Sequence, residues 1–368
     1  MEPTPTSILL CPPLDIKKDT TPAGAMVFDS TLLRKQSKIP QQFIWPPSER
    51  PRTLKELNAP VVDLHGFLRG DEASTLRAAE LIRTACTTHG FFQVTNHGVD
   101  ISLTRDAFAC MDQFFTLPLG CKLRAKRKPG SLWGYAGAHA DRFSSKLPWK
   151  ETLSFGYHDA GPQRMVVDYF TSVLGTDLER MGLVYQRYCE AMKELSLVIM
   201  EILAISLGVD RSFYRQFFED SSSIMRCNYY PPCQEPELVL GTGPHCDPTS
   251  LTILQQDQVG GLEVFIDDEW RSVRPIHDAL VINIGDTFMA LFLSLRCGPM
   301  HHHMHQTIGM FQRSKHPCTS AAPAAVEMAH HSTTSQSNNP LPPLPHFIIF
   351  YRYEYSNKMV GREKKHPQ

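Results

Sequence analysis

Several features that would place a chain in a specialised class are missing from this sequence. No stretch approaches the roughly 18 apolar residues of a membrane span, and no basic segment precedes the short apolar run near the N-terminus, so a signal peptide is not expected. The 10 cysteines form no Cys-x-x-Cys pair and no spacing typical of a disulfide framework. Free thiols in a reducing compartment are therefore expected, and the predicted location is the cytoplasm.

An excess of one charge is also missing. The 368 residues include 37 Lys and Arg against 38 Asp and Glu, for a net charge of -1. This balance predicts no nucleic-acid partner and no membrane partner, and a substrate with carboxylates would need a local basic pocket. Hydrophobic residues make up 42% of the chain, enough for a sizeable core. Nothing in the composition indicates an oligomeric state.

Composition and patterning divide the chain into five parts. Residues 1–55 are rich in Pro, Thr and Ser and read as a loosely ordered lead-in, followed by an N-terminal region over 56–165. Residues 166–219 predict a helical support, because apolar residues recur there at three- and four-residue steps. Residues 220–291 predict a strand-rich core, and 292–368 have the composition of an atypical low-complexity tail.

The strand-rich part consists of short apolar runs separated by turn residues. Such runs at this spacing, with helices outside them, predict a mixed α/β, β-rich sandwich or barrel. In the tail, only the aromatic run from Phe347 to Tyr355 has the composition of a strand. The basic stretch from Lys122 to Lys128 is interpreted as a solvated face.

A short motif, Gly243-Pro244-His245-Cys246-Asp247-Pro248, has the strongest chemical content. On extended backbone, side chains two residues apart point to the same face, so His245 and Asp247 can reach one metal ion. An imidazole with a carboxylate suits Fe(II), Mn(II) or Zn(II). His-x-Asp alone is a weak signal, and by itself it leaves an incidental pairing open.

The surroundings of this motif resemble the plant 2-oxoglutarate/Fe(II)-dependent dioxygenases, and specifically their gibberellin 20-oxidase branch. The resemblance covers roughly residues 38–291 and stops after Leu291. The Leu147–Thr152 segment is typical of the gibberellin 20-oxidase branch. The residues that carry the resemblance are His89–Val94, Asn96–Val99, Leu147–Thr152, Asn228–Cys233, Gly241–Leu254, Val259–Val264 and Asn283–Leu291.

The resemblance implies a double-stranded β-helix, or jelly roll, with flanking helices. It implies an iron ion held by two histidines and one carboxylate, with 2-oxoglutarate and O2 as co-substrates. His245 and Asp247 would be two of the ligands, and Tyr230 and Asn228 would contact 2-oxoglutarate. The implied substrate is a small diterpenoid acid, a C20 gibberellin oxidised at carbon 20.

The third iron ligand and the arginine that should bind 2-oxoglutarate fall in the divergent tail. His301 lies at the expected spacing, within a cluster of histidines, and is the candidate by spacing alone. Arg313 is the nearest candidate for the arginine, although the Arg-x-Ser pattern of the family is not reproduced there. Trp149 and Lys150 either line the substrate pocket or fix a loop.

Two functions remain open from the sequence. One is a working gibberellin 20-oxidase whose tail completes the barrel in its own way. The other is an inactive or truncated variant without a complete iron and 2-oxoglutarate site. In either case the last strands of the jelly roll are expected to be missing or replaced, and missing strands would leave exposed sheet edges.

Overall fold

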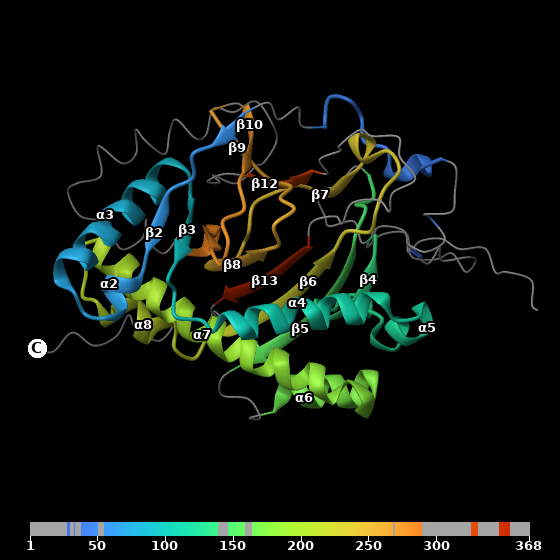
Figure 1. Cartoon of the computed structure of the whole chain (residues 1–368), viewed down its shortest axis with the longest axis horizontal. Helices are drawn as coiled ribbons and strands as arrows, with labels where there is room; N and C mark the ends of the chain where they lie inside the picture. Colours follow the sequence, from blue (N-terminus) through green and yellow to red (C-terminus); the bar gives the residue numbers. More distant parts are fainter. Residues whose placement is uncertain are drawn as a thin grey trace, which may run out of the picture.

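Two β-sheets face each other, and helices cover the outer side of the larger one (Figure 1). The computed structural model describes residues 28–29, 33, 38–50, 55–138, 146–158, 164–267, 269–288, 325–329 and 346–353. Side chains of both sheets, among them Leu254 and Val264, pack together in one buried cluster. This is the predicted jelly-roll arrangement with flanking helices.

The smaller sheet has five strands in the order β1-β10-β9-β12-β7. Its strands are β1 (Glu56–Leu57), β7 (Leu240–His245), β9 (Leu262–Ile266), β10 (Glu269–Val273) and β12 (Ala325–Ala329). The larger sheet has eight strands in the order β2-β3-β11-β8-β13-β6-β5-β4. Its strands are β2 (Val61–Asp63), β3 (Phe91–Thr95), β4 (Gly134–Gly137), β5 (Glu151–His158), β6 (Ser222–Tyr229), β8 (Leu251–Gln256), β11 (Leu280–Ile284) and β13 (His346–Tyr353).

The helices come mostly from the first 220 residues. The α-helices are α2 (His65–Leu68), α3 (Glu72–Thr88), α4 (Ile101–Thr116), α5 (Leu119–Lys122), α6 (Met165–Tyr169), α7 (Glu179–Ser206) and α8 (Ser212–Phe218). The short turns are η1 (Gln41–Phe43), η2 (Leu123–Ala125), η3 (Phe170–Leu174), η4 (Thr176–Leu178) and η5 (Pro236–Leu238). Among the described helices, none combines the length and the apolarity needed to cross a membrane.

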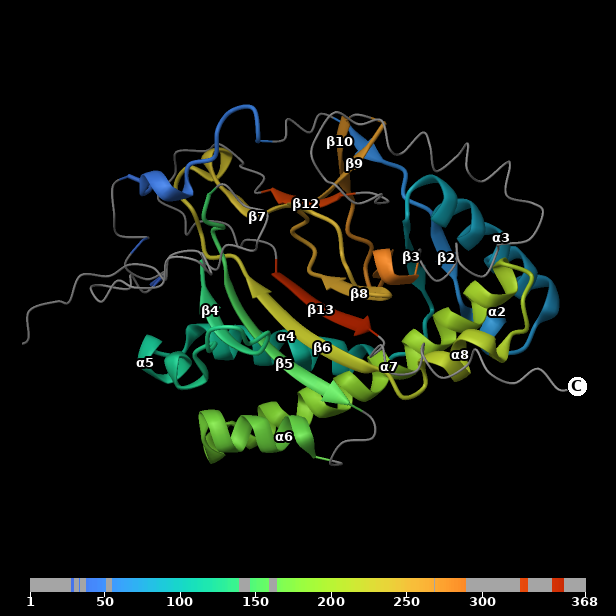
Figure 2. The same ribbon diagram turned by 180° about the vertical axis from the view of Figure 1, so that it is seen from behind.

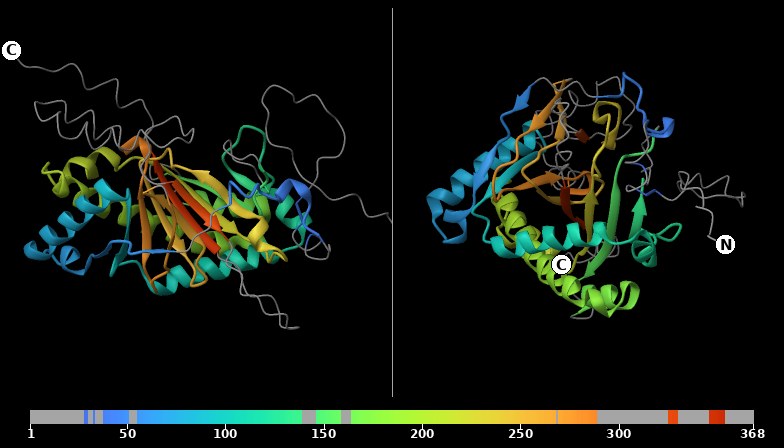
Figure 3. Two further views of the ribbon diagram at one scale, coloured as in Figure 1. Left: turned by 90° about the horizontal axis from the view of Figure 1, so that it is seen from above. Right: turned by 45° about the vertical axis from the view of Figure 1, so that its right-hand side comes forward.

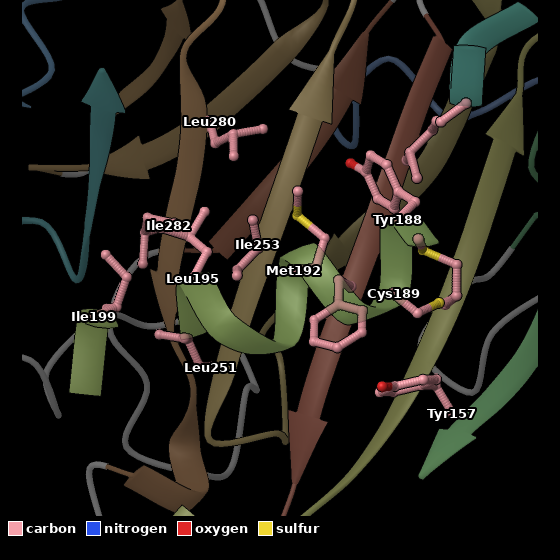
Figure 4. Close-up of a cluster of buried hydrophobic side chains, with 14 of the residues drawn as sticks. Tyr157, Tyr188, Cys189, Met192, Leu195, Ile199, Leu251, Ile253, Leu280 and Ile282 are labelled. Atoms are coloured by element: carbon pink, nitrogen blue, oxygen red, sulfur yellow. The ribbon is translucent and has the colours of Figure 1, made fainter. Parts of the chain in front are cut away.

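Helix α7 is the main support of the larger sheet, as its apolar stripe predicts. Met192 and Leu195 are buried in the same cluster as Ile253 of β8 and Ile282 of β11 (Figure 4). The helix ends before Gly208, whose φ of 69° lies in the left-handed region that glycine adopts without steric cost. The same helix packs against β13, so it holds sequence-distant strands in one layer.

The interpretation of Lys122–Lys128 as a solvated face is wrong at Lys122. Its side chain is buried, and its Nζ lies 2.6 Å from Oε2 of Glu151 on β5. Tyr135 of β4 donates its hydroxyl to the same carboxylate oxygen at 2.7 Å, and burial together with Glu151 raises the pKa of Tyr135 well above its usual range. Lys122 is thus the cation of a buried cluster that joins α5 to β4 and β5, strands that the sequence patterning did not predict.

The tail replaces the last strands of the jelly roll. Strand β13 lies between β6 and β8 and runs antiparallel to both (Figures 1 and 2). Strand β12 lies between β7 and β9. The aromatic run was predicted as a strand, but the expectation that nothing else in the tail could form one is wrong for Ala325–Ala329. Pairing with two open strand edges outweighs the weak intrinsic preference of that segment for strand.

Strand β13 has two different faces. Ile348 and Phe350 are buried in the cluster built around α7. Phe347, Ile349 and Tyr351 point the other way, into the space between the sheets. This alternation follows from the two-residue period of a strand.

Strand β13, in red, runs within the larger sheet (Figure 3), and hydrogen bonds tie both of its ends to the rest of the fold. At its start, the backbone N–H of His346 donates to Oδ2 of Asp257 at 2.7 Å. At its end, the buried guanidinium of Arg352 donates to the carbonyl oxygen of Phe218, in the last turn of α8. Helix C-termini favour a cation because their last carbonyl groups lack partners within the helix.

Candidate functional site

The predicted metal pair lies where β7 ends, at the edge of the space between the sheets. Nε2 of His245 is 3.7 Å from Oδ1 of Asp247. This separation is less than two metal–ligand bonds of about 2.1 Å, so one ion can contact both atoms. Nδ1 of His245 lies 2.9 Å from the carbonyl oxygen of Gly243. An Nδ1–H donated to that carbonyl leaves Nε2 unprotonated and available as a ligand.

Residues within and just after β11 hold the loop that carries Asp247. The amide nitrogen of Asn283 donates to Oδ2 of Asp247 at 3.3 Å, which leaves Oδ1 for the metal. The backbone N–H of Asp286 donates to the carbonyl oxygen of Asp247 at 3.0 Å. Gly285 is needed for this approach, since a Cβ there would lie 1.9 Å from the carbonyl oxygen of Thr249. The Asn-x-Gly-Asp sequence therefore acts as the outer shell of the metal pair.

A cavity lies beside this pair; its empty space of about 400 Å³ includes open solvent. Its lining comes from both sheets and from the tail strand. The lining residues are Lys150, Arg226, Asn228, Thr242, His245, Asp247, Thr252, Leu254, Asn283, Ile349 and Tyr351.

Two amide groups in this lining have unused hydrogen-bonding capacity. Oδ1 of Asn228 and Oδ1 of Asn283 are both buried, and neither accepts a hydrogen bond from the described residues. Buried polar atoms of this kind usually meet a protein group, a water or a ligand. Together with the His245–Asp247 pair, they fit a site that holds a metal ion and a polar co-substrate such as 2-oxoglutarate.

The lining also carries positive charge. Lys150 is almost fully buried, and its Nζ donates to Oγ1 of Thr242 at 3.0 Å. Arg226 of β6 donates from Nε to Oγ of Ser154 at 3.1 Å, and its guanidinium lies 5.5 Å from the centre of the Tyr351 ring. The sequence argument that a carboxylate substrate needs a local basic pocket agrees with this arrangement.

Two other predicted site residues, Trp149 and Tyr230, are not among the residues that line the cavity. Trp149 does not line it; the indole packs edge-on against Phe43 and donates to the carbonyl oxygen of Pro231 at 2.8 Å. Those contacts match its alternative role of fixing a loop. Tyr230 is fully buried, and its ring lies 5.7 Å from that of Phe347. Gly241 leaves room for this ring, and the predicted contact of Tyr230 with 2-oxoglutarate stays a prediction.

The third iron ligand and the predicted arginine are not placed. His301 and Arg313 lie outside the described residues, so their roles also stay predictions. Within the described ranges, no third His, Cys, Asp or Glu joins His245 and Asp247 in a metal-binding group. The described part of the chain thus supplies two candidate ligands, His245 and Asp247, and the residues that hold them.

Two cavity residues were missed by the sequence reasoning, although the signal was present. Asn228 was predicted to face the site on a strand, and the two-residue period then places Arg226 on the same face. Asn283 was part of a quoted motif but had no assigned role. Its distance from Asp247 in the sequence hides the contact, because only the pairing of β11 with β8 brings them together.

Comparison with known families supports this assignment in two parts. The model for the N-terminal region of non-haem dioxygenases of morphine synthesis matches residues 59–170. The model for the 2OG-Fe(II) oxygenase superfamily matches residues 221–320, a range that includes the metal pair and extends into the tail.

Individual relatives narrow the family further. The chain is 59% identical to gibberellin 20 oxidase 2 of Oryza sativa subsp. indica, covering 78% of this chain and 75% of the relative. It is 55% identical to gibberellin 20 oxidase 2 of Arabidopsis thaliana, covering 76% and 73%.

Solved structures with the same fold include one that contains 2OG and Fe. The JOX2 structure, solved with 2OG, Fe and JA, superimposes with a TM-score of 0.66 at 26% identity, over 90% of this chain and 84% of JOX2. Dioxygenase for auxin oxidation 1 from Arabidopsis thaliana, in its 2-oxoglutarate complex, gives a TM-score of 0.56 at 25% identity, over 80% and 91%. With its metal pair, polar cavity and close relatives, this chain belongs to the plant 2-oxoglutarate/Fe(II)-dependent dioxygenases, in the gibberellin 20-oxidase branch.

Proposed function

We propose that this chain oxidises carbon 20 of C20 gibberellins, with O2 and 2-oxoglutarate as co-substrates and Fe(II) as the metal. The observation that carries the proposal is the 59% identity to a rice gibberellin 20 oxidase over 75% of that relative. The cavity fits the proposal, because it joins a metal pair to buried amides and cations. None of the comparisons favours the inactive alternative.

Each residue of the site has a defined part in this proposal. His245 and Asp247 hold Fe(II) through Nε2 and Oδ1, and His301 is the candidate for the third position. When bound there, Fe(II) with 2-oxoglutarate would supply the activation of O2. Asn283 orients Asp247, and Asn228 offers its amide to 2-oxoglutarate. Lys150, a buried cation in the cavity lining, is assigned to a carboxylate of the gibberellin.

The apolar side of the cavity has a separate task. Leu254 and Ile349 line it from the larger sheet, next to Arg226, and both are buried. They suit the hydrocarbon skeleton of a diterpenoid, whose burial is favourable at about 25 cal/mol per Å² of apolar surface. They also exclude water from the reacting carbon.

The test is reconstitution of the full chain with Fe(II) under anaerobic conditions, followed by addition of 2-oxoglutarate, a C20 gibberellin and O2. The expected result is one iron per chain, succinate release that depends on the gibberellin, and products oxidised at carbon 20 by mass spectrometry. Substoichiometric iron without succinate would favour the inactive alternative. If turnover is seen, His301→Ala should abolish it, and unchanged turnover would exclude His301 as a ligand.

The proposal also covers the cellular location and the binding partners of the protein. We place the enzyme in the cytoplasm, with a small diterpenoid acid as its ligand and no nucleic-acid or membrane partner. Cell fractionation with a tagged chain checks the location.

We also propose a division of the chain into five parts, which limited proteolysis would test. The parts are a lead-in over 1–55, an N-terminal region over 56–165, a helical support over 166–219, a core over 220–291 and a tail over 292–368.

A further inference from the structure

One row of inward-facing residues crosses the larger sheet, starting beside the metal pair. It begins at Asn283, which holds Asp247, and it ends at Gly156 on β5, beyond β13 and β6 (Figure 2). The register places Asn283 opposite Thr252, Thr252 opposite Tyr351, Tyr351 opposite Ile224, and Ile224 opposite Gly156. Adjacent strands lie about 4.8 Å apart, so Gly156 lies roughly 10 Å beyond Tyr351 of the cavity lining.

Gly156 leaves a gap in this row that a side chain from another segment fills. Its neighbours Phe155 and Tyr157 are buried in the cluster around α7, so position 156 faces the other way, onto the face of the sheet that carries the cavity. A Cβ at Gly156 would lie 2.5 Å from the indole of Trp133. Trp133 therefore continues the row in place of a β5 side chain, and a glycine within a strand often marks such a close approach.

The loop that carries Trp133 is attached to the cavity wall. Nη2 of Arg127 donates to the carbonyl oxygen of Leu132, the residue before Trp133, at 3.0 Å. The same nitrogen lies 3.4 Å from Oγ of Ser154. That hydroxyl also accepts a hydrogen bond from Nε of Arg226, which lines the cavity. These contacts give Trp133 a defined place relative to the cavity.

Trp133 and Leu132 keep much of their apolar surface in contact with solvent despite this fixed position. Trp133 is 47% exposed and Leu132 is 57% exposed. An ordered aromatic side chain near a binding cavity offers a contact surface at a low entropic cost. On β6, the polar lining residues Arg226 and Asn228 lie to one side of Ile224. The row through Ile224 is therefore the apolar side of the sheet, and it suits a rigid hydrocarbon skeleton.

We propose that Trp133 is a specificity-determining residue, which contacts the hydrocarbon skeleton of the substrate at the outer end of this row. The inference rests on the proposed function, since it takes a diterpenoid acid as the substrate. With the reacting carbon at the metal pair, the skeleton extends past Tyr351, and the indole covers its far end. Trp133 then contributes to substrate affinity and not to the binding of metal or 2-oxoglutarate.

The test measures binding of a C20 gibberellin by calorimetry to the full chain loaded with 2-oxoglutarate and Mn(II), a redox-stable stand-in for Fe(II). In Trp133→Ala the affinity for the gibberellin should fall about 5- to 30-fold, because a large aromatic contact is lost. The affinities for Mn(II) and 2-oxoglutarate should stay unchanged. Trp133→Phe keeps a smaller ring and should lose less.

Fluorescence gives a second measure that a purely structural role would not affect. Gibberellin binding should shift the emission of the wild-type protein to shorter wavelengths, because the half-exposed indole of Trp133 leaves water. The shift should be absent in Trp133→Phe, even though that variant still binds the gibberellin.

Phe213 provides a matched control. Its ring is 39% exposed and belongs to α8, which packs against α7, and Phe213 does not line the cavity. Phe213→Ala also removes an exposed aromatic side chain and should leave the gibberellin affinity unchanged. Circular dichroism establishes that all variants are folded.

The outcomes separate the two proposals. If the wild-type protein binds the gibberellin and Trp133→Ala binds it equally well, the inference is wrong while the function stands. An accompanying loss of Mn(II) or 2-oxoglutarate affinity in Trp133→Ala also overturns it, because the residue then supports the cavity and does not select the substrate. If the wild-type protein binds Mn(II) and 2-oxoglutarate but no gibberellin, the proposed function fails together with the inference.

Discussion

Strands β6 and β13 lie side by side in the larger sheet, and they present different chemistry to the cavity. Both pack apolar side chains against the helical layer, Met225 and Cys227 from β6 and Ile348 and Phe350 from β13. Toward the cavity, β6 presents Arg226 and Asn228, whereas β13 presents Ile349 and Tyr351. Both strands therefore supply apolar side chains to the helical layer, but of the two only β6 supplies a cation to the cavity.

The difference follows from how specific each requirement is. A strand that packs on a helix needs only apolar side chains at every second position, which many aromatic or aliphatic runs satisfy. A ligand site needs particular groups at particular positions, held in place by neighbours. A tail of unrelated sequence can thus restore the sheet without restoring an ionic contact.

Substitution of two adjacent isoleucines tests the two faces of β13 directly. Ile348→Ala should lower the free energy of unfolding by about 3–4 kcal/mol, because it opens a void in the fully buried cluster. Ile349→Ala should cost about half as much, since Ile349 borders a cavity that already exists. Urea unfolding followed by circular dichroism measures both. Equal losses would show that the cavity face of β13 is packed as tightly as its helix face.

The buried cluster of Lys122 extends the comparison to β5, the other neighbour of β6. Lys122→Met alone should cost about 3 kcal/mol of unfolding free energy, because it leaves the Glu151 carboxylate buried without its cation. The double variant Lys122→Met/Glu151→Leu should recover part of that loss, since it removes the stranded charge. Chemical denaturation of the three proteins measures the coupling. Losses that simply add would indicate that the two side chains do not depend on each other.

The start of β13 should make stability depend on pH. Burial raises the pKa of Asp257 to about 6, although the backbone N–H groups of Val259 and His346 lower it, and nearby Asp112 raises it. Asp112 itself lies 3.7 Å from Nε2 of His346 and has a pKa raised by burial. Because the folded state keeps a proton on Asp257 that the unfolded state has lost, this contribution is complete below about pH 4 and disappears as the pH rises through 6.

The measurement compares the wild-type protein with Asp257→Asn between pH 4 and 7.5. The difference in unfolding free energy between them should change by roughly 2 kcal/mol across this range, with the wild-type protein losing stability relative to the variant as the pH rises. A difference that is flat with pH would mean that Asp257 does not titrate there. Asp112→Asn serves as a second variant, which separates the contribution of Asp112 to the pH dependence of the unfolding free energy.

The smallest expected effect concerns the cavity wall around Asp247, which β13 does not form. Asn283→Ala removes the amide that holds Oδ2 of Asp247, and Mn(II) affinity should fall about 10- to 100-fold. Thr252→Val, on the strand paired with Asn283, is the control and should change the affinity by less than about threefold. Calorimetric titration with Mn(II) measures both. A similar loss in the two variants would indicate general disturbance of the cavity wall.

Local sequence was enough for the features whose partners lie close in the chain. His245 and Asp247 are two residues apart, so extended backbone alone predicts that they share a face. The stripe of α7 and the short strands after residue 222 were also predicted from periodicity, and they are found as β6, β8, β9, β10 and β11. Strands β4 and β5 were missed because Gly-rich and mixed segments carry no clear period.

Features with distant partners required the fold. The burial of Lys122 depends on Glu151, which reaches it only when β5 joins the sheet. The strand at Ala325–Ala329 has little strand preference of its own and depends on the open edges of β7 and β9. The tail strand β13 pairs with β6 and β8, whose positions in the sheet the sequence does not state.

By itself, the sequence determined the family and the two-residue core of its metal site, because both rest on short motifs whose geometry is local. Only the tertiary structure decided how the tail is used and which cations face the cavity. Strand register sets which side chains point inward, and that register depends on pairings between segments far apart in the chain. Arg226 opposite Ile349 is the clearest case, a juxtaposition that neither segment encodes alone.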